Sequence, residues 1–299
     1  MDIHGDTAFM THLFCFGLGY SAQQTAQRLA ERGWRVSGTS TSAEGIAKLQ
    51  RAGFDVVLFD GTRASPEAGP LLAQATHVLL SIPPGPNGDP AFVHYGEAVA
   101  ASKSIAWIGY FSTVGVYGDA AGGWVSEDEE ARPASSRGKL RLAAERTWQT
   151  LGETSGKRVD IFRLPGIYGP GRSAIEDVKA GTARRLIKPG QVFNRIHVED
   201  IAAAVIAAID KGAPGRVYNV TDDEPGPPQD VVTYAAELLG RSPPPEIDFA
   251  TADLSPMARS FYSESKRVSN ARLKRELLPR LAYPTYREGL AAIAGLTKK

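Results

Sequence analysis

Short apolar runs that alternate with helical patterns set the fold class of this 299-residue chain. Each run in the first part of the sequence ends at a glycine, a proline or a polar residue. Apolar strands separated by helices predict βαβ units and a parallel sheet that is covered on both faces. Because such crossovers are almost always right-handed, the expected class is a doubly wound α/β fold. The runs are residues 13–16, 34–39, 54–59, 77–82, 104–112 and 159–164.

The overall composition excludes several classes of protein. Hydrophobic residues make up 42% of the chain and charged residues 22%, which is enough apolar material for a full core. A net charge of +1 gives no electrostatic reason to expect nucleic acid or an anionic membrane as a partner. One cysteine excludes a disulfide framework and a cysteine-rich zinc site, and the five histidines lack metal-ligand spacing. We therefore expect no metal site.

No segment of the sequence predicts a membrane or secretory protein. A bilayer-spanning helix needs roughly 20 consecutive apolar residues, and no stretch approaches that length. Residues 1–12 lack the apolar centre of a secretory signal. The expectation is a cytoplasmic protein that binds a small-molecule substrate, and a homodimer is left open.

Residues 17–22 form a G-x-G-x-x-A motif between the first apolar run and the first helical pattern. Gly17 permits a tight turn, Gly19 lets the backbone approach a pyrophosphate, and Ala22 is small enough for close helix–strand packing. The first N–H groups of the helix, from Tyr20 and Ser21 onward, are expected to face the anion. This context predicts a dinucleotide-binding Rossmann domain, with a ligand-free tight turn as the alternative.

The stretch after the second apolar run indicates which dinucleotide is bound. NAD-binding chains usually carry Asp or Glu there, about 20 residues after the glycines, to bind the ribose 2′-hydroxyl. Residues 38–42 contain no acid, which favours NADP and leaves NAD as the alternative cofactor. Ligands of doubly wound sheets bind beyond the carboxyl ends of the strands. The further residues predicted to bind the cofactor are Thr39, Ser40, Thr41, Ser42, Asp60, Ser81, Ile82 and Pro83.

Four later motifs add a family resemblance to this reading. With the glycine motif, they resemble the extended short-chain dehydrogenase/reductase family, the group of NAD(P)-dependent epimerases and dehydratases. Their order along the chain makes them far more specific together than singly. They are Ser-Thr-Val-Gly-Val-Tyr-Gly at 112–118, Arg-Leu-Pro-Gly-Ile-Tyr-Gly-Pro-Gly at 163–171, His-Val-Glu-Asp-Ile at 197–201 and Tyr-Asn-Val at 218–220.

The resemblance implies a division into two lobes. Residues 12–165 would form the Rossmann domain, to which residues 198–220 return. Residues 166–197 and 221–299 would form a smaller C-terminal lobe, and the substrate would bind between the lobes. The motif that contains Pro165 would pass beside the nicotinamide, which adds Pro165 to the predicted cofactor contacts.

In that family, a Ser or Thr, a Tyr and a Lys carry the chemistry. The tyrosine moves a proton, which requires help because its free pKa is about 10. The Ser/Thr position of the motif matches Thr113, with Ser112 beside it. Tyr117 is a candidate substitute proton donor, although a packed tyrosine at a sharp turn is the favoured alternative.

The Tyr-x-x-x-Lys pair of the family has no match in the expected helix. Anchoring the register on Glu145 puts Arg137 at the tyrosine position and Arg141 at the lysine position. Arginine cannot replace either residue as an acid or a base, but it can bind phosphate, carboxylate or ribose oxygens. The helical period predicts that Lys139 points to water. It also predicts an inward stripe, which consists of residues 137, 141, 144, 148 and 151.

These patterns predict an NAD(P)-binding oxidoreductase or epimerase/dehydratase-like enzyme with an altered active site. Its substrate would be small and polar, with sugar-like or anionic character. The alternative is a non-catalytic NADP-binding protein that senses redox state or regulates a partner. Two charged segments are expected to be solvated, namely the acidic run 127–130 and the pair Lys266–Arg267, although the pair could also bind an anionic substrate group.

Overall fold

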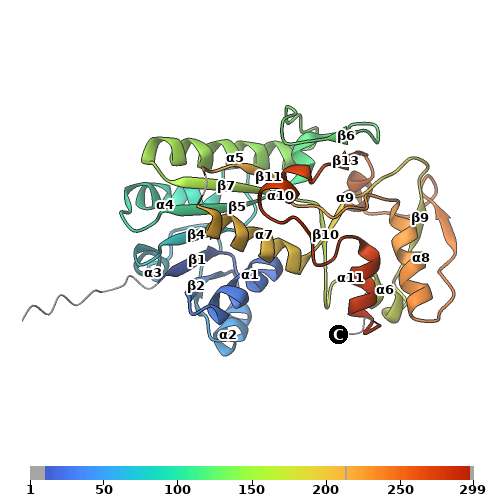
Figure 1. Ribbon diagram of the computed structural model, residues 1–299, viewed down its shortest axis with the longest axis horizontal. Helices are drawn as coiled ribbons and strands as arrows, with labels where there is room; N and C mark the ends of the chain where they lie inside the picture. Colours follow the sequence, from blue (N-terminus) through green and yellow to red (C-terminus); the bar gives the residue numbers. More distant parts are fainter. Residues whose placement is uncertain (1–10, 213, 297–299) are drawn as a thin grey trace, which may run out of the picture. The chain divides into compact units, whose positions relative to one another are not determined.

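A seven-stranded sheet lies at the centre of the computed structural model, which describes residues 11–212 and 214–296 (Figure 1). Across the sheet the order is β3-β2-β1-β4-β5-β7-β11, so successive strands are added outward on either side of β1. The pairs β1–β2, β2–β3, β1–β4, β4–β5 and β7–β11 are all parallel. This is the strand order of a doubly wound Rossmann sheet, which confirms the predicted fold class. The strands are β1 (His12–Phe16), β2 (Arg35–Ser40), β3 (Asp55–Leu58), β4 (His77–Leu80), β5 (Trp107–Thr113), β7 (Arg158–Leu164) and β11 (Val217–Asn219).

Helices alternate with these strands along the chain, as the apolar periodicity predicts. Within residues 11–212 and 214–296, none of the helices has the length and apolar character that crossing a membrane requires. The helices that follow the strands of the sheet are α1 (Tyr20–Glu31), α2 (Ala43–Arg51), α3 (Ala68–Ala73), α4 (Pro90–Ala101), α5 (Ser136–Ser155) and α7 (Val198–Lys211).

The chain divides into two compact units, and each is described by itself. The first comprises residues up to Tyr110 together with Arg146–Asp160. The second comprises Phe111–Glu145 and the residues from Ile161 onward. The sequence predicts a different division, at residue 165, between a cofactor-binding lobe and a substrate-binding lobe. That functional division stays a prediction.

The core of the first unit forms around β1. All five residues of this strand are buried, and α1 packs through the buried residues Ala22, Ala26 and Leu29. The two alanines allow the helix backbone to approach the sheet closely, which is the packing role predicted for Ala22. Burial raises the pKa of the Cys15 thiol, so this cysteine acts as a small core residue.

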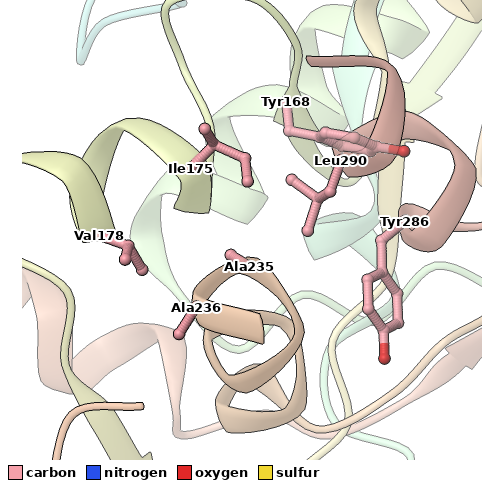
Figure 2. Packing of buried hydrophobic residues seen from close by; sticks show 7 residues of the cluster. All are labelled: Tyr168, Ile175, Val178, Ala235, Ala236, Tyr286 and Leu290. Atoms are coloured by element: carbon pink, nitrogen blue, oxygen red, sulfur yellow. The ribbon is translucent and has the colours of Figure 1, made fainter. Parts of the chain in front are cut away.

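Three helices surround a smaller apolar core in the second unit. The helices α6 (Ala174–Ala180), α8 (Pro228–Leu238) and α11 (Tyr286–Ile293) pack against β8 (Gly166–Tyr168), as Figure 2 shows. Ala235 and Ala236 lie on the packed face of α8, where small side chains allow close helix contacts. The other members of this core are Tyr168, Ile175, Val178, Tyr286 and Leu290.

Short elements complete the second unit. Three parallel pairs, β8–β10, β9–β12 and β6–β13, form two-stranded sheets. Thr113 caps the 3-10 helix η1 (Val114–Tyr117) that leaves the central sheet. The remaining elements are β6 (Trp124–Val125), β9 (Arg185–Ile187), β10 (Arg195–His197), β12 (Glu246–Asp248), α9 (Pro256–Phe261), β13 (Arg267–Val268) and α10 (Ala271–Glu276).

Candidate dinucleotide turn and active-site motifs

The turn after β1 is built by contacts that only glycine permits. Gly17 has a φ of +85°, and a Cβ there would lie 2.6 Å from Cγ2 of Ile82. A Cβ on Gly38 would lie 2.5 Å from the carbonyl oxygen of Cys15. Thr39 then fixes the turn, because its Oγ1 accepts a hydrogen bond from the Gly17 N–H at 2.9 Å and its carbonyl accepts one from Leu18 at 2.9 Å.

Gly19 differs from Gly17, because nothing in the part of the chain that the structure describes requires a glycine at this position. Its φ is −79°, which any residue can adopt, and a Cβ there would meet no atom within 4 Å. Gly19 is the N-cap of α1, yet no side chain caps this helix and no acid lies in its first turn. In contrast, Ser42 and Asp89 cap α2 and α4 through their side chains. The start of α1 thus offers open space at Gly19 and no N-cap side chain, which fits a pyrophosphate.

The hydroxyl-rich stretch after β2 is partly committed to the fold. Thr39 is buried and holds the first turn, and the Ser42 hydroxyl accepts from the N–H of Gly45 at 3.1 Å. Ser40 is half-buried and Thr41 is exposed. Arg35 lies at the start of β2, where it pairs with Asp55 at 3.0 Å, so it does not supply a charge to this stretch.

The remaining predicted cofactor contacts lie at strand ends. Ser81 and Ile82 follow β4, and the Ser81 N–H donates to the carbonyl of Phe16 at 2.9 Å. Asp60 follows β3 and accepts from the N–H and hydroxyl of Thr62, and these hydrogen bonds lower its pKa. Pro83 is exposed. Pro165 belongs to the second unit, where it is half-buried directly after β7.

A buried charge network joins the active-site motifs within the second unit. The Ser112 hydroxyl donates to Oε1 of Glu145. Arg163 binds the same carboxylate through Nε at 3.2 Å and a terminal nitrogen at 2.8 Å. The side chains of Arg163 and Glu145 are only 7% and 1% exposed. Ser112, predicted as catalytic, therefore holds Glu145 rather than facing an open site.

Tyr117 extends this network. Its hydroxyl donates to Oδ1 of Asn219 at 2.8 Å, and the Arg163 guanidinium lies 4.8 Å from the centre of its ring. Burial raises the pKa of Tyr117, and the nearby Arg163 opposes that rise. A buried phenol whose pKa is raised is a poor proton donor near neutral pH, so the geometry favours the packed-tyrosine alternative.

Thr113 and Arg141 lie where β5 leaves the sheet. Thr113 is half-buried, and its Oγ1 accepts from the Gly115 N–H at 3.1 Å, which leaves the hydroxyl hydrogen for another acceptor. Arg141 donates to the carbonyl of Phe111 at 2.9 Å. This arginine therefore supports the end of β5 from α5.

The predicted phase of α5 is correct except at its first turn. Ala144, Trp148 and Leu151 are buried, and Lys139 is exposed as expected. Arg137 is exposed, so its assignment to the inward stripe is wrong. The buried residue of that turn is Gly138, where a Cβ would lie 3.0 Å from the carbonyl oxygen of Gly115. The packed face of the helix thus begins at Gly138, next to Arg137.

In each of the two charged segments expected to be solvated, at least one residue is bound to the protein. Glu127 is half-buried and accepts from the backbone N–H of Asn219 at 2.7 Å, because β11 is the edge strand of the sheet and its outer N–H groups need partners. Lys266 is buried and pairs with Glu264 at 2.6 Å. The prediction of solvation is wrong for both residues, although Glu129 and Glu130 are exposed.

Sequence reasoning missed Glu145, Arg163 and Asn219 as the partners that bind the predicted residues. Arg163 and Asn219 lie in the family-like motifs and Glu145 lies in the expected helix, and the available signal was their polar character in apolar surroundings. Within the described ranges, no group of three or more His, Cys, Asp or Glu residues could hold a metal ion.

Comparisons with known proteins agree with this architecture. Residues 98–221 match the model of the NAD dependent epimerase/dehydratase family. The Escherichia coli (strain K12) protein YeeZ is 31% identical over 243 residues, which cover 76% of this chain and 84% of YeeZ. A functionally unknown conserved protein from Silicibacter pomeroyi DSS has a structure with a TM-score of 0.86 and 46% identity, covering 96% of this chain and 99% of that chain.

A more distant structure shows the same fold. UDP-glucuronic acid 4-epimerase from Bacillus cereus, solved in complex with NAD, has a TM-score of 0.74 at 18% identity and covers 96% of this chain and 98% of that chain. The glycine turn, the strand order and the match to YeeZ together establish that this chain belongs to the NAD dependent epimerase/dehydratase family.

Proposed function

We propose that this protein is an NADP(H)-binding oxidoreductase or epimerase-type enzyme that acts on a small polar substrate with sugar-like or anionic character. The observation that carries the proposal is Gly19, a glycine that neither backbone conformation nor packing demands. A position kept open without a structural reason supports the approach of a ligand. The start of α1 beside it, where the N-cap has no side chain, supports an anionic one.

The first unit would hold the cofactor through its glycine turn. The N–H groups of Tyr20 and Ser21 would bind the pyrophosphate, and Gly17 would keep the turn tight. Asp60, Ser81, Ile82 and Pro83 remain predicted contacts at the strand ends. When bound, the nicotinamide would supply or accept a hydride.

The preference for NADP is part of the proposal. Ser40 ends β2 and Thr41 follows it, and no acid at these positions would repel a 2′-phosphate, although Glu44 lies in the first turn of α2. With Thr39 and Ser42 committed to the fold, Ser40 and Thr41 are the residues proposed to contact the adenosine ribose. The family match supports an NAD-type dinucleotide and leaves the choice between NAD and NADP to experiment.

Thr113 is the residue proposed to act on the substrate. Its hydroxyl hydrogen can polarise a carbonyl or alcohol oxygen, which is the role of the Ser/Thr position in the family. Arg141 would act indirectly, since its guanidinium holds the carbonyl of Phe111. Arg137 is exposed and stays the predicted clamp for an anionic group.

A regulatory NADP-binding protein is the second candidate, and one set of observations favours it. Tyr117 is bound to Asn219, Ser112 to Glu145 and Arg141 to Phe111, so these predicted catalytic side chains are occupied by the protein. A dinucleotide turn without a proton donor would suit a sensor of the cofactor. The cytoplasmic location, the homodimer and the absence of a nucleic-acid partner stay predictions of the sequence.

Calorimetry with NADPH and NADH tests the proposed function. We expect NADPH to bind more tightly than NADH, because no acid opposes its 2′-phosphate at the end of β2. Equal affinities or tighter NADH binding would contradict the NADP preference, and the absence of binding by either dinucleotide would contradict the whole proposal. Mass spectrometry of ligands that co-purify with the protein provides an independent reading.

A further inference from the structure

A pocket of about 450 Å³ lies in the second unit between β8, β10 and the three helices of the smaller core. Tyr168, Val231, Tyr286 and Leu290 give it an apolar and aromatic wall. Figure 2 shows three of these side chains: Tyr168 and Leu290 lie close together in the view, and the Tyr286 ring points away from them. A concave site with aromatic walls and a few polar groups is typical of a small-ligand pocket.

Two arginines line this pocket, the exposed Arg172 and the half-buried Arg195 of β10. The Arg195 guanidinium donates to the carbonyl oxygens of Phe193 at 3.1 Å and Gly226 at 3.3 Å, and it lies 5.6 Å from the ring centre of Tyr286. Among the residues that the structure describes, no carboxylate oxygen lies within 4.0 Å of this guanidinium. Arg195 therefore has neutral protein partners and no close counter-ion.

The nearest source of negative charge is Asp222, and at neutral pH it compensates Arg195 only weakly. Asp222 is 2% exposed, and its Oδ2 is buried without a hydrogen-bond partner. Burial raises the pKa of Asp222 to about 8, and Arg195 opposes the rise. The other charged or titratable groups that act on it are Glu224 and Asp223 from its own loop and Tyr168 from β8. A largely protonated Asp222 leaves the charge of Arg195 uncompensated.

We propose that this pocket binds the anionic group of a small polyhydroxy ligand, a sugar acid or a sugar phosphate, through Arg195. The proposal rests on the proposed function, since it names the class of substrate. A half-buried guanidinium without a close carboxylate is stabilised by an anion, and its planar fork suits a carboxylate or a phosphate. Tyr168 and Tyr286 would pack against the carbon face of the ligand.

The rim of the pocket fits the other end of such a ligand. Glu176 and Asp177 of α6 line it beside the exposed Arg172, and Glu176 already accepts from the Ser173 hydroxyl at 2.5 Å. Carboxylates accept hydrogen bonds from hydroxyl groups, whereas they repel a second anion. The arrangement therefore favours a ligand with one anionic end and a hydroxyl-bearing end over a small inorganic anion.

Titration calorimetry with three related probes tests the proposal: glucuronate, glucose 6-phosphate and uncharged glucose. We expect at least one of the two anions to bind and glucose to bind more weakly by roughly tenfold or more. The anion that binds more tightly shows whether Arg195 prefers a carboxylate or a phosphate. Equal binding of glucose and both anions, or no binding of any probe, overturns the proposal.

Variants assign the binding to Arg195. Arg195→Met should weaken binding of the anion by roughly 10- to 100-fold. Arg241→Met is the matched control, because Arg241 also donates to backbone carbonyls in this unit but does not line the pocket. Loss of binding in Arg137→Met with full binding in Arg195→Met would contradict the proposal. NADPH binding is measured with each variant as well. Loss of anion binding with intact NADPH binding concerns this pocket alone, whereas loss of NADPH binding concerns the proposed function.

The isosteric change Asp222→Asn provides a test that keeps the fold. Raising the pH from 7 to 9 ionises Asp222 in the wild type, so its negative charge competes with the ligand for Arg195. Anion binding should weaken by roughly fivefold over this range in the wild type and stay nearly constant in Asp222→Asn. The same pH dependence in both proteins would contradict the role of this pocket.

Discussion

The glycine turn of the first unit and the β5–α5 region of the second unit relate to ligands in opposite ways. At Gly19 there is space that no atom of the described residues fills, and the N-cap of α1 has no side chain to cap the helix. Around β5 the polar side chains bind one another, as Ser112 binds Glu145 and Tyr117 binds Asn219. A group that the protein already satisfies is a weaker sign of a ligand site than a position left open.

Breaking the buried ion pair should give the largest effect on stability. Glu145→Gln leaves the Arg163 guanidinium buried without its counter-ion, which we expect to cost about 3–5 kcal/mol of unfolding free energy. Urea unfolding measures the loss. Asp55→Asn is the matched control, because its pair with Arg35 is exposed and should cost less than about 1 kcal/mol. Equal losses in the two variants would show that the network does not hold β5 and α5 together.

Filling the glycine turn should abolish the function of the first unit and spare its fold. Gly19→Val should weaken dinucleotide binding by more than about 100-fold, because its side chain would enter the pyrophosphate space. Unfolding free energy should change by less than about 1 kcal/mol, since a Cβ meets no protein atom there. Gly69→Val is the control, because Gly69 also has open space but lies on α3. Full binding by Gly19→Val would remove the main support for the cofactor site.

The first unit should also lose stability in acid through His77. Burial, with Arg158 nearby, lowers the pKa of His77 to about 4, and its ring packs against Trp34 and Trp107. In the unfolded chain His77 binds a proton near pH 6.5, but in the folded chain it does so only near pH 4. Its contribution to the unfolding free energy is therefore fully present above pH 6.5 and is lost as the pH falls from 6.5 to 4. We expect this residue to account for about 1–3 kcal/mol of that loss.

Comparison of the wild type with His77→Gln isolates the effect of this histidine. The difference in unfolding free energy between the two proteins should narrow as the pH falls from 7 to 4. His94→Gln serves as the control, because His94 lies elsewhere in the unit, beside the carbonyl of Gly61 and edge-on to the Phe59 ring. A difference that stays constant with pH would show that His77 does not titrate below its usual range.

The smallest effect should come from Tyr117. Tyr117→Phe removes one hydrogen bond to Asn219 and keeps the ring beside Arg163, so we expect a loss of about 1 kcal/mol. The packed-tyrosine alternative predicts that NADPH binding and any turnover are unchanged. A large loss of turnover with little loss of stability would identify Tyr117 as the proton donor after all.

Local backbone requirements were predictable from the sequence, and long-range side-chain pairings were not. The roles of Gly17 and Ala22 follow from the turn and the helix that contain them, and the structure agrees with both. The partners of Ser112 and Tyr117 lie 33 and 102 residues away, so no pattern of spacing could reveal them. Arg137 shows the same limit, because helical periodicity gives the phase of α5 but not the residue where its packing begins.

The central claim is that this chain has kept a dinucleotide turn while its usual proton donors are absent or bound. Oxidation of NADPH at a saturating concentration, followed across a panel of aldehydes, neutral ketones, sugar acids and nucleotide sugars, tests it most directly. We expect tight NADPH binding with little or no turnover of neutral ketones, and any turnover to depend on Thr113, as measured with Thr113→Val. Rapid reduction of a neutral ketone that is unaffected by Thr113→Val would contradict the account.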